Sequence, residues 1–205
     1  TRGRIYPKEI ARFLDVIMQR ADEDILFSVH LHDDLGFALV NNLASIRRGV
    51  MMPSTSWLGL AERNGLLRTE LLTVHLAYET ELIGDKLDIE GDGLFLSQPN
   101  LKMIKKIADK VSEYTGIGLK TTDPIVGTGV NSISTGTPFV DTISFQPFDP
   151  ETILGIPQTI HVTQLASKRV ITEVSKKMGF ELTEEQTDKI LRIVKSKAYE
   201  TGRSI

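Results

Sequence analysis

Hydrophobic residues in the first 80 positions follow helical spacing in some segments and extended spacing in others. We predict helices over 7–18, 38–48 and 66–78, and strands over 25–32 and 50–58. Pro53 predicts that the second strand is short or irregular, because proline cannot donate to a strand ladder. The order helix, strand, helix, strand, helix implies parallel strands joined by crossover helices.

The spacing also predicts which side chains are buried. The first helix begins near Pro7 and should bury one stripe, and the second should end at Gly49 with its own apolar residues inward. The expected buried residues are Ile10, Phe13, Leu14, Ile17, Met18, Leu39, Leu43 and Ile46. Two β/α units cannot close a parallel barrel, and their sheet edges would stay unpaired. We therefore expect the remaining strands either upstream in the same polypeptide or in another chain.

The pattern of hydrophobic and polar residues changes after residue 83. A turn-rich connection over 84–93 precedes a predicted helix over 99–114, and residues 121–149 show no helical period. Such long loops are usually functional or disordered. Two further helices are expected over 159–178 and 184–200, the second starting from a capping box at 183–186. We place domain boundaries at 83/84 and 149/150.

Composition excludes several classes of partner. The net charge of -3 gives no basic patch for nucleic acid, and no apolar stretch approaches the roughly 20 residues of a membrane span. The chain has no cysteine, which fits a reducing cytoplasm, and no secretory signal opens it. We expect a cytoplasmic protein.

The chemistry most worth testing lies in the segment Ser28-Val29-His30-Leu31-His32-Asp33-Asp34-Leu35-Gly36. Side chains at i and i+2 of a strand point to the same face, so His30 and His32 can converge on one ion. A hydrogen-bonded histidine pair or a polar strand end is the competing interpretation. Imidazole suits zinc, iron or nickel, and the neighbouring carboxylates extend the choice to magnesium or manganese.

Three segments together resemble a known family. The segment at 30–42 has the pattern His-x-His, Asp34, Gly36, Ala38 and an asparagine at 41 or 42. Gly59-Leu60-Ala61-Glu62-Arg63-Asn64-Gly65 is similar to the Gly-x-Gly-Glu-Arg-x-Gly segment of the last barrel strand, with Ala61 in place of a glycine. Thr1-Arg2-Gly3-Arg4-Ile5-Tyr6-Pro7 is similar to the end of the sixth strand. The chain thus resembles the superfamily of 2-isopropylmalate synthase, homocitrate synthase and HMG-CoA lyase.

The resemblance implies an α/β fold: the C-terminal part of a (β/α)8 TIM barrel over 1–83, a linker, helix and active-site loop over 84–149, and a helical subdomain over 150–205. Weaker similarity at Ile125-Val126-Gly127 and over 180–205 favours the synthase branch. It further implies a missing N-terminal half-barrel, in cis or in trans, and a homodimer.

The implied reaction is a Claisen condensation of acetyl-CoA with a 2-oxo acid. A divalent ion (Mg, Mn or Zn), held by His30, His32 and an upstream aspartate, would polarise the ketone. The main base would also lie upstream of Thr1, so the isolated chain is expected to be inactive. Thr1 would bind the substrate carboxylate.

Polar neighbours would support this site. Asp33 and Asp34 would orient the histidine N–H groups, although simple solvation is an equal alternative for Asp33. Glu62 and Arg63 would form an ion pair beside the barrel mouth. His75 and His161 receive no role.

One departure bears on specificity. The synthases usually carry a catalytic histidine in the loop corresponding to 130–137, where this chain has Ile133 instead. Hydroxyls there, at Ser134 and Thr135, would bind a substrate with an extra carboxylate, so oxaloacetate and a Re-type citrate synthase are the specificity hypothesis. The competing functions are a non-catalytic interaction or regulatory fragment with structural histidines, and an HMG-CoA lyase-like carbon–carbon lyase.

Overall fold

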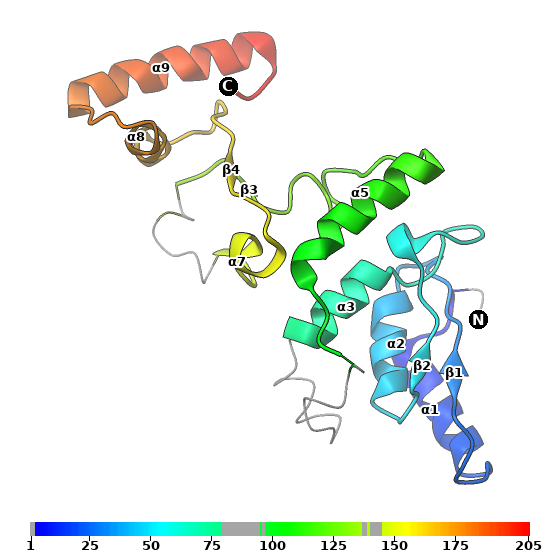
Figure 1. Cartoon of the computed structure of the whole chain (residues 1–205). Helices are drawn as coiled ribbons and strands as arrows, with labels where there is room; N and C mark the ends of the chain where they lie inside the picture. Colours follow the sequence, from blue (N-terminus) through cyan, green and yellow to red (C-terminus); the bar gives the residue numbers. More distant parts are fainter. Residues whose placement is uncertain (1–2, 79–94, 96, 137–138, 140–144) are drawn as a thin grey trace. The chain divides into compact units, whose positions relative to one another are not determined.

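The computed structural model describes residues 3–78, 95, 97–136, 139 and 145–205. These residues form two compact units, which are described separately (Figure 1). The first unit comprises the described residues up to 119 together with 124–126, and the second comprises 120–123 and the described residues from 127 onward. The expected boundary at 83/84 falls outside the described residues.

The first unit has the predicted alternation of helix and strand. Its elements are α1 (Pro7–Met18), β1 (Ser28–Val29), α2 (Ala38–Ile46), β2 (Met52–Pro53), a 3₁₀ turn η1 (Trp57–Gly59), α3 (Thr69–Tyr78), a second 3₁₀ turn η3 (Leu101–Met103) and α5 (Ile104–Thr115). Strands β1 and β2 pair in parallel, with Ser28 opposite Met52 and Val29 opposite Pro53. The parallel pairing is confirmed, and β2 is as short as Pro53 predicted.

Helix α1, with Ala44 of α2, packs against β1 and the residues that flank the strand pair. One core cluster joins α1 to β1, to Leu31 beyond it and to Val50, and a second joins α2 to α3. The first cluster contains Ile10, Leu14, Val29, Leu31 and Val50. Phe13 is a correction to the expected stripe, because 56% of it is exposed. It lies beside the stripe that Ile10 and Leu14 form, at the margin of the buried helix face.

Two helices of the first unit start later than their sequence pattern predicts. Helix α3 begins at Thr69 and not at Leu66, because Leu66 and Arg68 form isolated bridges with His32 and Ser56. The segment expected to be helical from 99 instead forms η3 before α5 starts. The bridges of Leu66 and Arg68 join residues that are distant in sequence, so the local hydrophobic pattern cannot predict them.

The second unit contains a strand pair that the sequence pattern did not predict. Strand β3 (Ser132–Ile133) pairs in parallel with β4 (Thr159–Ile160), and α7 (Pro150–Leu154) lies between them in the chain. The segment 121–149, predicted to have no helical period, thus contains the short strand β3, and α7 begins directly after it at Pro150. The helix expected over 159–178 is wrong in its first part, since α8 (Lys168–Lys177) starts nine residues later.

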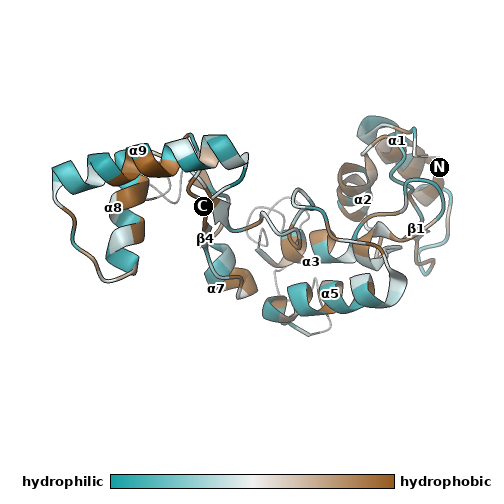
Figure 2. Ribbon diagram, turned by 90° about the horizontal axis from the view of Figure 1, so that it is seen from above, coloured by the Kyte–Doolittle hydropathy of each residue, from teal (hydrophilic) through white to brown (hydrophobic). Residues whose placement is uncertain are grey.

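Helices α8 and α9 (Glu184–Thr201) form the C-terminal part of the second unit, with their hydrophobic surfaces meeting (Figure 2). Their shared core includes Val170, Ile171, Leu191 and Val194. The predicted capping box of α9 is confirmed, because the Thr183 hydroxyl accepts from the Gln186 N–H at 3.2 Å and the Gln186 amide oxygen accepts from the Thr183 N–H at 2.9 Å. This cap fixes where α9 starts.

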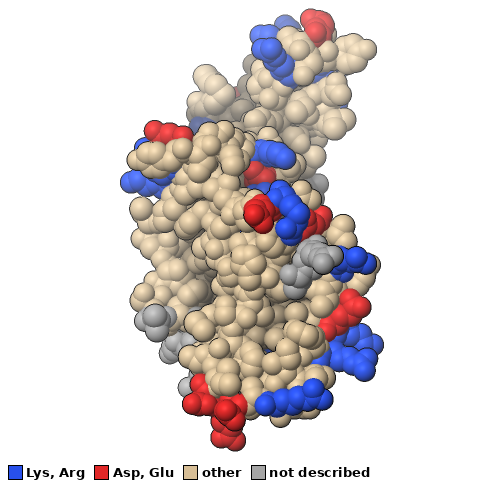
Figure 3. Space-filling view, turned by 90° about the vertical axis from the view of Figure 1, so that its right-hand side faces the viewer, with Lys and Arg blue, Asp and Glu red and all other residues tan. Residues whose placement is uncertain are grey.

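Charged residues of both signs lie interspersed on the face drawn in Figure 3, in small groups separated by uncharged surface. This distribution is what a net charge of -3 with 24 basic and 27 acidic residues leads one to expect. Within the described ranges, no helix has the length and apolar character needed to cross a membrane.

Candidate metal centre

The two histidines of the His-x-His segment lie on one face of the extended chain that leaves β1. Val29 and Leu31 are buried against α1, so His30 and His32 project to the opposite face. His30 is exposed, whereas only 9% of His32 is accessible. The Nε2 atoms of the two rings lie 3.3 Å apart, and the rings are inclined at 68°. The expectation that both imidazoles lie on the same face of the extended chain is therefore confirmed.

This separation fits two ligands of one cation. Two nitrogen ligands at about 2.1 Å from a single ion, with a bond angle of about 90–109°, lie about 3.0–3.4 Å apart. A hydrogen bond between the two rings is compatible with the same distance. Within the described part of the chain, no group of three His, Asp or Glu residues could hold a metal ion. Among the described residues, the pair thus offers two potential nitrogen ligands.

Ser54 is the polar neighbour of His30 that the sequence analysis missed. Its Oγ lies 3.1 Å from His30 Nδ1, and its N–H donates to the Val29 carbonyl at 2.8 Å. The parallel register that matches Val29 with Pro53 brings Ser54 alongside His30 at the next position. Ser54 can be identified only from the register of β1 against β2, and the sequence pattern does not give that register.

His32 is held more by backbone than by side chains. It forms an antiparallel bridge with Leu66, and the next residue, Asp33, donates its N–H to the Gly65 carbonyl at 2.9 Å. Its Nδ1 is buried and has no hydrogen-bond partner among the described residues. When both Nε2 atoms bind a cation, that Nδ1 carries the proton and requires an acceptor.

The two aspartates after the histidines do not orient the imidazoles as expected. Asp33 Oδ1 accepts from the Ala38 N–H at 2.8 Å and so satisfies a free amide at the start of α2. Asp34 forms a bidentate pair with Arg63, with Nε–Oδ1 at 2.8 Å and the second nitrogen to Oδ2 at 3.0 Å. In the region that the structure describes, Arg63 thus pairs with Asp34 and not with Glu62.

This Asp34–Arg63 pair changes both ionisation equilibria. The hydrogen bonds from Arg63 are the largest cause that lowers the pKa of Asp34, and the same contact raises the pKa of Arg63. Asn64 adds a bond from its side-chain amide to the Asp34 carbonyl at 3.2 Å. Residues 63 and 64 therefore fasten the loop over 59–65 to the end of the His-x-His segment.

The loop over 59–65 holds a backbone shape that few residues allow. Leu58 and Arg63 both have φ of 57°, in the left-handed region that non-glycine residues rarely adopt. The Leu58 N–H donates to the fully buried Glu70 carboxylate at 3.1 Å. Gly65 has φ of 86°, and a Cβ there would stand 2.0 Å from the Gly59 carbonyl oxygen. The close loop crossing beside His32 therefore requires glycine at position 65.

The remaining expected site residues belong to the second unit or fall outside the described residues. Thr1 falls outside the described range, although Gly3 approaches closely enough that a Cβ would stand 2.5 Å from Asp34 Oδ2. Ser134 and Thr135 belong to the second unit, directly after the buried Ile133 of β3. Ser134 borders a cavity of about 350 Å³ there, together with Thr163, Gln164 and Arg203.

Comparison with known proteins connects this geometry to one family. The sequence model of the HMGL-like family matches residues 1–113. Among curated proteins, the chain is 27% identical to a probable 2-isopropylmalate synthase of Methanopyrus kandleri over 95% of its length, and 26% identical to a homocitrate synthase of Sulfolobus acidocaldarius over 96%. It is 28% identical to a 2-isopropylmalate synthase of Staphylococcus epidermidis over 89%. The chain spans 37%, 39% and 35% of these three relatives respectively.

Proposed function

This chain belongs to the HMGL-like family, and from that premise we propose that it is part of a metal-dependent enzyme that condenses acetyl-CoA with a 2-oxo acid. Family membership implies a fold of the TIM-barrel type, and members generally depend on a divalent metal ion. The observation that carries the proposal is the 3.3 Å approach of the His30 and His32 Nε2 atoms. The names of the relatives, 2-isopropylmalate synthase and homocitrate synthase, support the reaction class.

In this proposal His30 and His32 hold the ion, and an aspartate of an N-terminal half-barrel completes the ligand set. The bound ion, which we take to be Mg, Mn or Zn, supplies Lewis-acid polarisation of the substrate ketone. Nitrogen ligands favour zinc, whereas magnesium and manganese prefer the oxygen ligands that carboxylates supply. Thr1 donates a hydrogen bond to the substrate carboxylate, and the base that deprotonates acetyl-CoA lies in the upstream segment.

Other residues of this chain keep the metal centre in shape. Asp34 and Arg63 fix the loop over 59–65, whose Gly65 carbonyl receives the N–H of the residue after His32. Glu62 precedes Arg63 on the same loop and contributes to the raised pKa of Arg63. A fixed loop matters because ligand positions that drift by about 1 Å reduce catalysis strongly.

We further propose oxaloacetate as the 2-oxo acid, which makes the enzyme a Re-type citrate synthase. The support is chemical: Ser134 and Thr135 offer hydroxyl donors for a second carboxylate, at a loop where the buried Ile133 offers none. A homodimer would bring this loop to the metal centre of a second subunit. A panel of acceptors that contains oxaloacetate, 2-oxoisovalerate and 2-oxoglutarate tests this choice.

The experiment compares the 205-residue chain with an extended chain, defined as this sequence together with the polypeptide that precedes it. Each is assayed for bound metal and for release of free CoA thiol from acetyl-CoA with each acceptor. We expect turnover from the extended chain and none from the shorter one. His30→Gln should abolish turnover, whereas His75→Gln, on α3, should retain it. An extended chain that binds no metal and releases no CoA would favour the non-catalytic alternative.

A further inference from the structure

We propose that Ser54 is a positioning residue for the metal centre. Its hydroxyl accepts a hydrogen bond from His30 Nδ1–H and so selects the tautomer whose Nε2 has a free lone pair for a divalent cation. The inference rests on the function proposed above, because it concerns the same two histidines. It adds a residue that neither the His-x-His pattern nor the loop motif at 59–65 contains.

The parallel register explains why this contact is built into the strand pair. Ser28 faces Met52 and Val29 faces Pro53, so His30 and Ser54 occupy the next matched positions. The Ser54 N–H donates to the Val29 carbonyl at 2.8 Å, which fixes the backbone of Ser54 beside His30. The 3.1 Å distance from Oγ to Nδ1 then follows without a long or flexible side chain.

The tautomer of His30 decides whether its Nε2 can bind a cation. A neutral imidazole carries one proton, so a proton on Nδ1 leaves a lone pair on Nε2 and a proton on Nε2 removes it. Histidines that bind metals commonly donate the opposite N–H to a neighbouring acceptor. Ser54 Oγ stands where that acceptor is needed, while Nε2 of the same ring points to Nε2 of His32.

Carboxylates often orient metal-binding histidines, but here the two adjacent ones are engaged elsewhere. Asp33 accepts from Ala38 N–H, and Asp34 accepts two bonds from Arg63. Within the described ranges, the side-chain contact to His30 Nδ1 is the one from Ser54. A hydroxyl oxygen can accept the Nδ1–H bond and orient the ring without placing a negative charge beside it.

The first test reads the tautomer directly and needs no metal. Ring nitrogen chemical shifts of His30 are measured by NMR on the metal-free extended chain at a pH where the imidazoles are neutral. We expect protonated Nδ1 in the wild type, a shift toward protonated Nε2 in Ser54→Ala, and recovery in Ser54→Thr. Ser28→Ala is the matched control, because Ser28 is exposed on the same face of β1, two positions before His30.

The second test measures Zn²⁺ binding to the same variants by calorimetry. We expect Ser54→Ala to bind about 10–100-fold more weakly than the wild type, the loss typical for a group that orients a metal ligand. Ser54→Thr and Ser28→Ala should stay close to the wild type. Unchanged tautomer and unchanged Zn²⁺ affinity in Ser54→Ala would overturn the role of Ser54.

These outcomes separate the two proposals. Weaker Zn²⁺ binding in Ser54→Ala, in a protein that never releases CoA, supports the positioning role and counts against the condensation reaction. CoA release that depends on His30, with Zn²⁺ affinity indifferent to Ser54, supports the reaction and rejects the positioning role.

Discussion

His32 combines deep burial with a ring nitrogen, Nδ1, that has no hydrogen-bond partner among the described residues. A buried N–H without an acceptor costs about 1–3 kcal/mol. The described chain satisfies His30 Nδ1 through Ser54 but leaves His32 Nδ1 without a bond. His32 Nδ1 is therefore the polar atom at this centre whose burial the described contacts do not offset.

The glycine at position 65 provides a sharp test of the loop over 59–65. Gly65→Ala should destabilise the first unit by more than about 3 kcal/mol, because it adds a clash at 2.0 Å to an unfavourable φ of 86°. Gly49→Ala is the matched control, since Gly49 has φ of 87° and nothing within 4 Å of an added Cβ. It should lose only about 1–2 kcal/mol. Urea unfolding of both variants measures the difference, and equal losses would contradict the clash.

Arg63 permits a test of the Asp34–Arg63 pair. Arg63→Lys keeps the positive charge but cannot make the two parallel bonds to Asp34, so it should loosen the loop nearly as much as Arg63→Ala. Amide hydrogen exchange at Asp33 and Leu66 reports this, because both amides bond to the loop, to Gly65 and Gly59 respectively. Slow exchange retained in Arg63→Lys would show that charge alone is sufficient.

Secondary-structure elements determined by contacts within a few residues are predicted correctly from the sequence, whereas those determined by distant contacts are not. Helix α1, helix α9 and the capping box at 183–186 were predicted from the sequence because their signals lie within a few residues. The start of α8 was not, because residues 159–160 belong instead to a strand that pairs with 132–133. His30 and His32 were found by spacing, whereas Ser54 depends on a strand register that periodicity does not contain.

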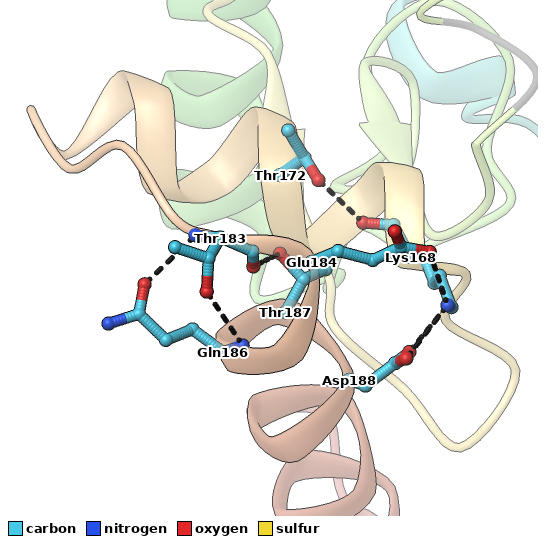
Figure 4. A network of polar contacts seen from close by, with 7 residues as sticks. All are labelled: Lys168, Thr172, Thr183, Glu184, Gln186, Thr187 and Asp188. Atoms are coloured by element: carbon cyan, nitrogen blue, oxygen red, sulfur yellow. Dashed lines mark hydrogen bonds and ion pairs between the residues drawn. The ribbon is translucent and has the colours of Figure 1, made fainter.

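The cap of α9 is the element-level feature whose loss is easiest to quantify (Figure 4). Thr183→Ala removes the hydroxyl that accepts from the Gln186 N–H, although the backbone N–H of residue 183 can still donate to the Gln186 side chain, and it should cost about 1 kcal/mol of stability. Thr172→Ala, inside α8, removes a hydroxyl that bonds back to the Lys168 carbonyl and should change stability by less than about 0.5 kcal/mol. Thermal unfolding followed by circular dichroism compares the two, and equal effects would argue against the cap.

Asp149 gives the start of α7 a defined pH dependence. Hydrogen bonds from Thr152 and then from the Glu151 N–H lower the pKa of Asp149 below its usual value of 3.8. Since the folded-state pKa is the lower one, the stabilisation is present above pH 3.8 and is lost as the pH falls through the folded-state pKa. NMR titration of the Asp149 carboxyl carbon should give a midpoint below 3.8. Thr152→Val should move that midpoint upward, and an unmoved midpoint would assign the shift to another cause.

For the molecule as a whole, metal binding should stabilise the folded state, and within this chain it should act through the two histidines. A cation that binds the folded chain adds about 2.7 kcal/mol at a free concentration 100 times its dissociation constant. Hydrogen exchange of the extended chain with and without Zn²⁺ should show the largest gain in protection at β1, β2 and the loop over 59–65, because His30, Ser54 and His32 connect these segments. His30→Gln should remove the gain and His75→Gln should keep it. If Zn²⁺ raises the protection of these amides against exchange equally in His30→Gln and in the wild type, the cation binds elsewhere. The proposed reaction would then lose its physical basis.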